Sequence, residues 1–240
     1  MARIDGREND QLRPVEILPG INRFAEGSCL IRCGNTHVLC TASVEERTPP
    51  HVPEGEGWVT AEYSMLPRAN RERSKRDVSK LKLSPRSAEI QRLIGRSLRA
   101  AVDLEALGDH TVTIDCDVLQ GDGGTRTASV TGGFIALALA CRKILELGWI
   151  EGNPIRHYVA AVSAGIVADR PMLDLCYEED SRAMVDLNCV MDDSGRLIEL
   201  QGTGEGRSYT LDEQQELVRL CAGGIRELIA KQKEILKGLV

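Results

Sequence analysis

Gly121-Asp122-Gly123-Gly124-Thr125-Arg126 runs without a break into residues 127–148, where apolar side chains recur at helical spacing. Glycines allow a backbone to turn its N–H groups toward a ligand, and the first turn of a helix adds unpaired donors and the positive end of a dipole. Arg126 contributes a guanidinium that matches the oxygens of a phosphate. The stretch therefore has two interpretations, a phosphate site or only a tight connection before a helix.

Strands and helices alternate on both sides of this stretch. Runs rich in β-branched or alternating apolar residues predict strands over residues 14–18, 27–33, 36–44, 60–65, 111–119, 159–167, 171–177 and 183–191. Helical spacing predicts helices over residues 84–104, 127–147 and 211–239. Gly34-Asn35 is typical of a hairpin turn, and Thr210 with Glu213 forms a capping-box pattern. The order strands, helix, strands, helix predicts a mixed α/β (α+β) fold built from a duplicated unit.

The composition is that of a globular protein. The 240 residues are 42% hydrophobic and 28% charged, which is sufficient for a sizeable core. Eight cysteines lie mostly in apolar runs and are expected to be reduced; Cys29 and Cys33 lack the second pair that a zinc site needs. The first residues are polar, and no apolar run is expected to reach the roughly 20 residues of a membrane span. We therefore expect a cytoplasmic protein with no membrane partner.

A basic island interrupts this acidic chain, whose net charge is −6. Between residues 68 and 99, eight arginines and three lysines face only three acidic residues. The bases are Arg68, Arg71, Arg73, Lys75, Arg76, Lys80, Lys82, Arg86, Arg92, Arg96 and Arg99. Because phosphate contacts depend on the local field, the island favours an RNA or DNA backbone site; the alternative is an ordinary solvated surface.

Five carboxylates flank the turn of an expected hairpin: Asp174, Glu178, Glu179, Asp180 and Asp186. In a strand over residues 183–191, Asp186 shares the polar face with Asn188. Asp180, in the preceding turn, can lie over the same end of the strand. The two aspartates therefore predict an Mg²⁺ site or a proton donor, whereas Glu178 and Glu179 are interpreted as an acidic turn in water.

Segments along essentially the whole chain resemble the ribonuclease PH family of phosphate-dependent 3′-to-5′ exoribonucleases. They are Arg3-Ile4-Asp5-Gly6-Arg7 with Leu12-Arg13-Pro14, Gly27-Ser28-Cys29 leading to Gly34-Asn35-Thr36, Glu62-Tyr63-Ser64-Met65-Leu66-Pro67-Arg68, Glu89-Ile90-Gln91-Arg92-Leu93-Ile94-Gly95-Arg96, residues 115–127 and residues 174–186. Their number and order carry the resemblance. One departure is the stretch of residues 77–85, which lacks the family's glycine-containing loop and has Pro85 where many relatives have glycine.

The resemblance implies a ribosomal protein S5 domain 2-like fold, with one domain over residues 1–240 and two pseudo-symmetric halves meeting near residue 148. It implies a ring-shaped homohexamer made of three dimers. The family's phosphate-binding positions fall on Arg86, Gly124, Thr125 and Arg126, and its catalytic, Mg²⁺-binding carboxylates fall on Asp180 and Asp186. Its arginines for RNA fall on Arg68, Arg71, Arg73, Arg76, Arg92 and Arg96.

The reaction implied is phosphorolysis, in which inorganic phosphate attacks the last phosphodiester of an RNA 3′ end and releases a nucleoside diphosphate. The reverse reaction adds nucleotides. Because the nucleophile arrives with the substrate, the lack of any cluster among His37, His51, His110 and His157 is understandable. The expected partners are RNA 3′ ends, with tRNA precursors or structured ribosomal RNA left open as the main substrate. Two alternatives remain: a non-catalytic RNA-binding ring subunit and a hydrolytic two-metal exonuclease.

Overall fold

The computed structural model describes residues 3–76 and 83–237, which form nine strands and five helices. The strands are β1 (Val15–Pro19), β2 (Gly27–Cys33), β3 (Thr36–Glu45), β4 (Trp58–Met65), β5 (Thr111–Gln120), β6 (Val159–Val167), β7 (Arg170–Leu173), β8 (Val185–Asp192) and β9 (Leu197–Gly204). The helices are α1 (Pro85–Arg99), α2 (Leu104–Leu107), α3 (Thr125–Glu146), α4 (Tyr177–Asp180) and α5 (Leu211–Ile235). The mixed α/β class predicted from the sequence is confirmed.

The first half of the chain forms a five-stranded sheet in the order β1-β2-β3-β5-β4. Its pairs are antiparallel except for β4 with β5, which is parallel. The predicted hairpin at Gly34-Asn35 is confirmed, because Cys33 pairs with Thr36 and Gly34 has a φ of +55°. Every second residue at the start of β3 is buried, which turns one face of the sheet toward the core.

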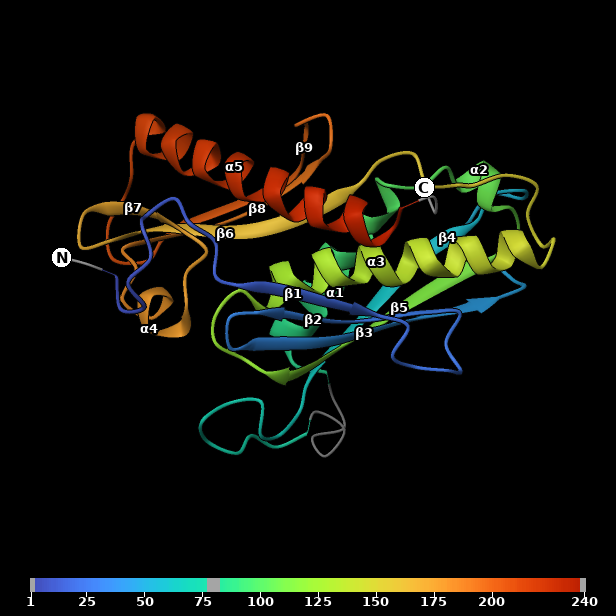
Figure 1. Cartoon of the computed structure of the whole chain (residues 1–240), viewed down its shortest axis with the longest axis horizontal. Helices are drawn as coiled ribbons and strands as arrows, with labels where there is room; N and C mark the ends of the chain where they lie inside the picture. Colours follow the sequence, from blue (N-terminus) through green and yellow to red (C-terminus); the bar gives the residue numbers. More distant parts are fainter. Residues whose placement is uncertain (1–2, 77–82, 238–240) are drawn as a thin grey trace.

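The second half forms a four-stranded antiparallel sheet in the order β7-β6-β8-β9. Helix α5 lies across this sheet, and its apolar stripe, including Leu217, Ile225 and Leu228, packs on β6 and β8 (Figure 1). The predicted capping box at its start is confirmed: Glu213 N–H donates to Thr210 Oγ1 at 3.1 Å, and Thr210 N–H donates to the Glu213 carboxylate at 2.7 Å.

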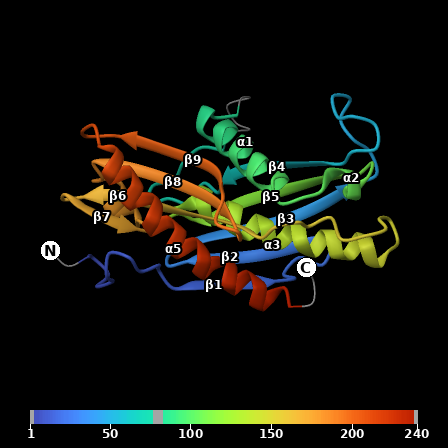
Figure 2. The ribbon, with the colours of Figure 1, turned by 90° about the horizontal axis from the view of Figure 1, so that it is seen from above.

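Helix α3 joins the two halves, since it packs on β2 and β3 of the first sheet and on β6 of the second (Figure 2). It is long and apolar enough to cross a membrane by length and composition, so the expectation that no run reaches this length was wrong. Its apolar character has another cause, because 78% of the apolar stretch is buried inside the protein. The close packing needs Gly27, where a Cβ would lie 2.0 Å from Ala136 O.

Some element boundaries differ from the predicted ones. The predicted helix over residues 84–104 ends at Arg99, and α2 begins separately because the Asp103 side chain caps it by accepting from Ala106 N–H. The predicted strand over residues 171–177 ends at Leu173, and a short helix, α4, follows. Strand β9 was not predicted at all.

Two further predictions concern the cysteines and the segment before α1. All eight cysteines are free thiols and six are buried, as expected of reduced core residues. The bases Lys80 and Lys82, and most of the departure over residues 77–85, lie outside the described residues.

Candidate active site

A cavity of about 620 Å³ lies where the first turn of α3 meets the second sheet. All six residues predicted for phosphate and catalysis line it: Arg86, Gly124, Thr125, Arg126, Asp180 and Asp186. They come from α1, α3 and the residue before it, α4 and β8, so four separate parts of the chain meet here. Asn70, Ser163, Tyr177, Asn188 and Glu205 complete much of the wall.

The loop of residues 121–124 gives the cavity a helix N-terminus. Gly124 is the N-cap of α3 with a φ of +64°, and no side chain caps this end of the helix. Gly123 has a φ of +76°, and a Cβ there would lie 2.4 Å from Leu175 O. Both positions therefore require glycine, and the first N–H groups of α3 are left for an anion.

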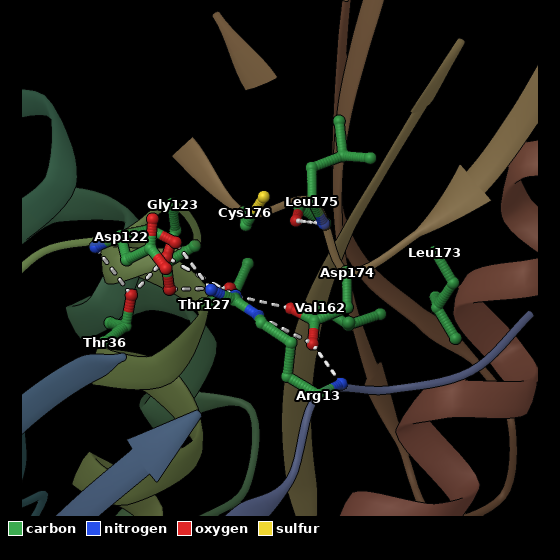
Figure 3. Close-up of polar contacts among 12 residues, drawn as sticks. Arg13, Thr36, Asp122, Gly123, Thr127, Val162, Leu173, Asp174, Leu175 and Cys176 are labelled. Atoms are coloured by element: carbon green, nitrogen blue, oxygen red, sulfur yellow. Dashed lines mark hydrogen bonds and ion pairs between the residues drawn. The ribbon is translucent and has the colours of Figure 1, made fainter. Parts of the chain in front are cut away.

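A buried ion pair between Arg13 and Asp174 holds this loop in place (Figure 3). Arg13 Nη2 lies 2.6 Å from Asp174 Oδ1, and the same guanidinium donates to Asp122 O at 2.5 Å and Gly123 O at 3.4 Å. Thr36 Oγ1 accepts from Asp122 N–H at 2.9 Å and donates to Gly123 O at 2.6 Å. Burial alone would raise the pKa of Asp174, but the Arg13 guanidinium brings it below its ordinary value.

The Arg126 guanidinium is oriented by two residues that were not predicted. Its Nη1 donates to Gln201 Oε1 at 2.6 Å and lies 3.6 Å from Glu89 Oε1, while Gln201 Nε2 donates to Glu89 Oε1 at 2.8 Å. Glu89 lies on α1 and Gln201 on β9, so three elements meet at Arg126. Gln201 could not be found from the sequence because β9 itself was missed. Thr125 is tied to the first sheet by Tyr63, with 2.8 Å between the two hydroxyl oxygens.

The two aspartates that line the cavity carry raised pKa values. Burial, together with the charge of Asp180, raises the pKa of Asp186 to about 6, against the opposing effects of Arg126 and a 3.1 Å hydrogen bond from Asn188 Nδ2. Partial desolvation also raises the pKa of Asp180, although Arg86 and Arg126 oppose it and the residue itself is exposed. Two like charges thus face one cavity next to two arginines.

The interpretation of Glu179 as an acidic turn in water was wrong. Its side chain is 3% exposed and takes a two-pronged ion pair from Arg3, at 2.9 Å and 2.7 Å. It also accepts from Cys176 N–H at 3.2 Å and so caps the start of α4. Glu178 behaves as expected, since it pairs with Arg182 on the surface. Glu179 thereby anchors the short helix that ends with Asp180.

The arginines predicted for RNA do not line this cavity. Arg92 and Arg96 line a separate hollow of about 330 Å³ with Trp58 and Arg99, and Arg96 pairs with Glu199 at 3.1 Å. The other four, Arg68, Arg71, Arg73 and Arg76, are exposed on the segment after β4, which projects from the body of the molecule in Figure 1. Their role with RNA stays a prediction.

Comparisons with known proteins agree with this architecture. Residues 11–143 match the model for domain 1 of the 3′ exoribonuclease family, and residues 157–220 match the model for domain 2. The chain belongs to the 3′ exoribonuclease family. Ribonuclease PH from Solibacter usitatus is 54% identical over 98% of this chain and 100% of its own length. Ribonuclease PH from Syntrophomonas wolfei is also 54% identical, over 98% and 99% of the two chains.

Solved exosome structures from this family share the fold. An archaeal exosome core superposes with a TM-score of 0.77 at 26% identity, covering 97% of this chain and 91% of the other. An Archaeoglobus fulgidus exosome with RNA bound to its active site gives 0.80 at 26% identity, covering 96% and 92%.

These findings confirm the resemblance to ribonuclease PH and the S5 domain 2-like duplicated fold. They also confirm a phosphorolytic 3′-to-5′ exoribonuclease, a tRNA nucleotidyltransferase, over the two alternatives. The roles of individual residues, and the boundary between the halves near residue 148, stay predictions.

Proposed function

We propose that inorganic phosphate binds in the cavity between Arg86, Arg126 and the N–H groups of Gly124 and Thr125. The observation that carries the proposal is the meeting of two arginines, an uncapped helix N-terminus and two carboxylates in one cavity. Arginine forks and helix N-termini are both protein groups that hold phosphate. The RNA 3′ end then enters from the side of Asp180 and Asp186.

In the reaction, an oxygen of the bound phosphate forms a bond to the phosphorus of the last phosphodiester. The bond from that phosphorus to the 3′ oxygen of the preceding nucleotide breaks, which gives a nucleoside diphosphate and an RNA one residue shorter. Phosphoryl transfer depends mainly on in-line positioning and on neutralising charge, and Arg86 and Arg126 do both. Asp186, with its pKa raised to about 6, orients or protonates the departing 3′ oxygen.

Asp180 and Asp186 are also the residues that would hold Mg²⁺. The described residues contain no cluster of three or more His, Cys, Asp or Glu side chains suited to a metal. Mg²⁺ nevertheless needs only one or two carboxylates when waters and substrate phosphates supply its other ligands. Asp180 and Asp186 line the same cavity, and the charge of Asp180 adds to burial in raising the pKa of Asp186, so a cation there would meet two carboxylates and the donor set fits. Bound there, the ion would neutralise charge on the transferring phosphoryl group.

For the RNA, we propose that the exposed arginines of residues 68–76 bind the body of a tRNA precursor. The same basic surface would also suit a structured ribosomal RNA. We further propose a homohexamer of three dimers that works in the cytoplasm. The exosome structure with RNA bound to its active site supports an RNA substrate.

The test is to incubate the purified protein and Mg²⁺ with an RNA that carries a short unstructured 3′ tail, with and without inorganic phosphate. Nucleoside diphosphates released only with phosphate are expected, and Arg126→Lys should raise the KM for phosphate at least about tenfold by losing the fork. Monophosphates released without phosphate would contradict phosphorolysis, and RNA that is bound but intact would contradict catalysis.

A further inference from the structure

The N–H group of Gly124, one of the proposed phosphate donors, belongs to the loop of residues 121–124, which is held in place by residues outside the cavity. Arg13 and Asp174 are 4% and 5% exposed, and Thr36 is fully buried. They lie on the segment before β1, the residue after β7 and the first residue of β3, so the two halves of the chain meet at this loop. We call these three residues the loop clamp.

Within the loop clamp, Asp174 orients the side chain of Arg13. Its backbone has a φ of +51°, rare for a residue other than glycine, and its N–H donates to Ser163 O at 2.6 Å. Its carboxylate accepts three hydrogen bonds from Arg13: from the backbone N–H at 2.8 Å, from Nε at 3.0 Å and from Nη2 at 2.6 Å. Such a pair leaves the Arg13 guanidinium one orientation, with its remaining N–H groups aimed at the loop.

The clamp acts on the carbonyl groups of the loop. Arg13 binds the carbonyl oxygens of Asp122 and Gly123, and Thr36 binds Gly123 O from β3. In a trans peptide the carbonyl of one residue and the N–H of the next point in opposite directions. Holding these two carbonyls toward Arg13 therefore turns the N–H groups of Gly123 and Gly124 away from it. Both glycines line the catalytic cavity.

We infer that Arg13, Asp174 and Thr36 are positioning residues for the phosphate co-substrate, which set its affinity through the peptide planes of residues 122–124 without touching it. Glycine at positions 123 and 124 gives the backbone of the loop conformational freedom. That freedom would lower the affinity for phosphate, because a mobile loop would have to be ordered on each binding event. The clamp removes that freedom in advance. This inference rests on the proposed phosphate site.

Thr36→Val is the sharpest test, because it removes the hydroxyl that bonds the loop and keeps the side-chain shape. Thr131 supplies a matched control, since it is equally buried and its hydroxyl accepts from Ala161 N–H at 3.1 Å and donates to Ala161 O at 3.2 Å. Thr131→Val therefore makes a similar loss without removing a hydrogen bond to the loop. Thr36→Ser keeps the hydroxyl, and Arg13→Lys keeps the charge but not the fork.

We expect Thr36→Val to raise the KM for phosphate about fivefold to tenfold, as the loss of one or two hydrogen bonds predicts. The KM for RNA and kcat at saturating phosphate should stay within about twofold of the parent. Thr36→Ser should restore the KM for phosphate, and Arg13→Lys should raise it further. Thr131→Val should match Thr36→Val in its unfolding midpoint in urea, yet leave the KM for phosphate unchanged.

Equal phosphate KM values for Thr36→Val and Thr131→Val would overturn the inference, as would a fall in kcat with the phosphate KM unchanged. Arg126→Lys, measured alongside, separates the two claims. If Arg126→Lys raises the phosphate KM and Thr36→Val does not, only the clamp fails. If Arg126→Lys leaves it unchanged, the proposed phosphate site fails and the clamp fails with it.

Discussion

At the scale of single residues, charge pairing divides the carboxylates of the site into two kinds. Asp174 and Glu179 are buried against Arg13 and Arg3, and each has a pKa below its ordinary value even though burial opposes this. Asp186 lies beside Asp180, without such a dedicated partner, and its pKa is raised to about 6. A carboxylate that pairs tightly with an arginine supports structure, and one whose pKa is raised toward the working pH in a cavity is suited to proton transfer.

Asp186→Asn should therefore lower kcat for phosphorolysis about 100-fold or more, the usual contribution of a group that orients or transfers a proton. The fold should remain, since the amide fills the same space. The measurement is diphosphate release at saturating phosphate and Mg²⁺. Asp193→Asn is the control, because Asp193 lies on the turn after β8 and pairs with Lys233. Full phosphorolysis by Asp186→Asn would remove its proposed role.

Gly123→Ala should destabilise the protein by about 2–4 kcal/mol, because a Cβ would meet Leu175 O at 2.4 Å in a backbone with a φ of +76°. Gly6 offers a matched control with a φ of +77° and nothing within 4 Å of its Cβ. Gly6→Ala should lower the free energy of unfolding only by the cost of placing an alanine at a positive φ, about 1 kcal/mol. The free energies of unfolding in urea give both values. Equal losses in the free energy of unfolding would mean that the close approach of residue 123 to Leu175 does not add to the cost of the alanine side chain.

At the scale of elements, the turn between β8 and β9 depends on one carboxylate. Asp192 is 6% exposed and accepts from Ser194 N–H and Oγ and from Arg196 N–H and Nε, at 2.6–2.9 Å. Burial opposes ionisation, yet these four donors lower the pKa of Asp192 to about 2. A lowered pKa stabilises the fold above the unfolded-state value near 4, and this contribution disappears as the pH falls through about 2.

We therefore expect Asp192→Asn to reduce the free energy of unfolding by about 1–2 kcal/mol at pH 7. The difference from the parent protein should shrink below pH 4 and vanish near pH 2. Urea unfolding of both proteins between pH 7 and the lowest pH at which they stay folded checks this. A difference that stays constant over that range would show that the ionised carboxylate does not hold the turn.

The strands and helices also show how much of the fold could be predicted from the sequence. Strands β2, β3, β5 and β6 were found because their apolar residues face a core, and the capping box found α5. Strand β9 was not predicted because it lies at the edge of its sheet, has no buried residue and contains Gly202 and Gly204. Because β9 was not predicted, Gln201, which lies on it and orients Arg126, was not predicted either. The glycine loop and the aspartates were predictable from local chemistry, but the clamp joins residues 13, 36 and 174, which only the fold brings together.

At the scale of the whole molecule, the six arginines predicted for RNA are separate from the cavity of the candidate active site. Arg92 and Arg96 line a hollow beside Trp58, and neither borders the cavity that holds Asp186. The arginines of residues 68–76 project from the body on an exposed segment (Figure 1). The arginines proposed for RNA therefore lie outside the wall of the cavity in their own chain. In the proposed ring, arginines of one subunit would serve RNA bound to its neighbour.

This arrangement predicts that activity depends on assembly. On serial dilution, the specific activity on a tailed RNA should fall over the same concentration range in which sedimentation shows rings and dimers giving way to monomers. The loss should lie mainly in the KM for RNA, since each chain keeps its phosphate cavity while the neighbour's arginines are withdrawn. Protein crosslinked as a ring before dilution is the control and should keep its activity. Full activity in a proven monomer would contradict the shared RNA site, because a single chain would then supply every group that the reaction and the RNA require.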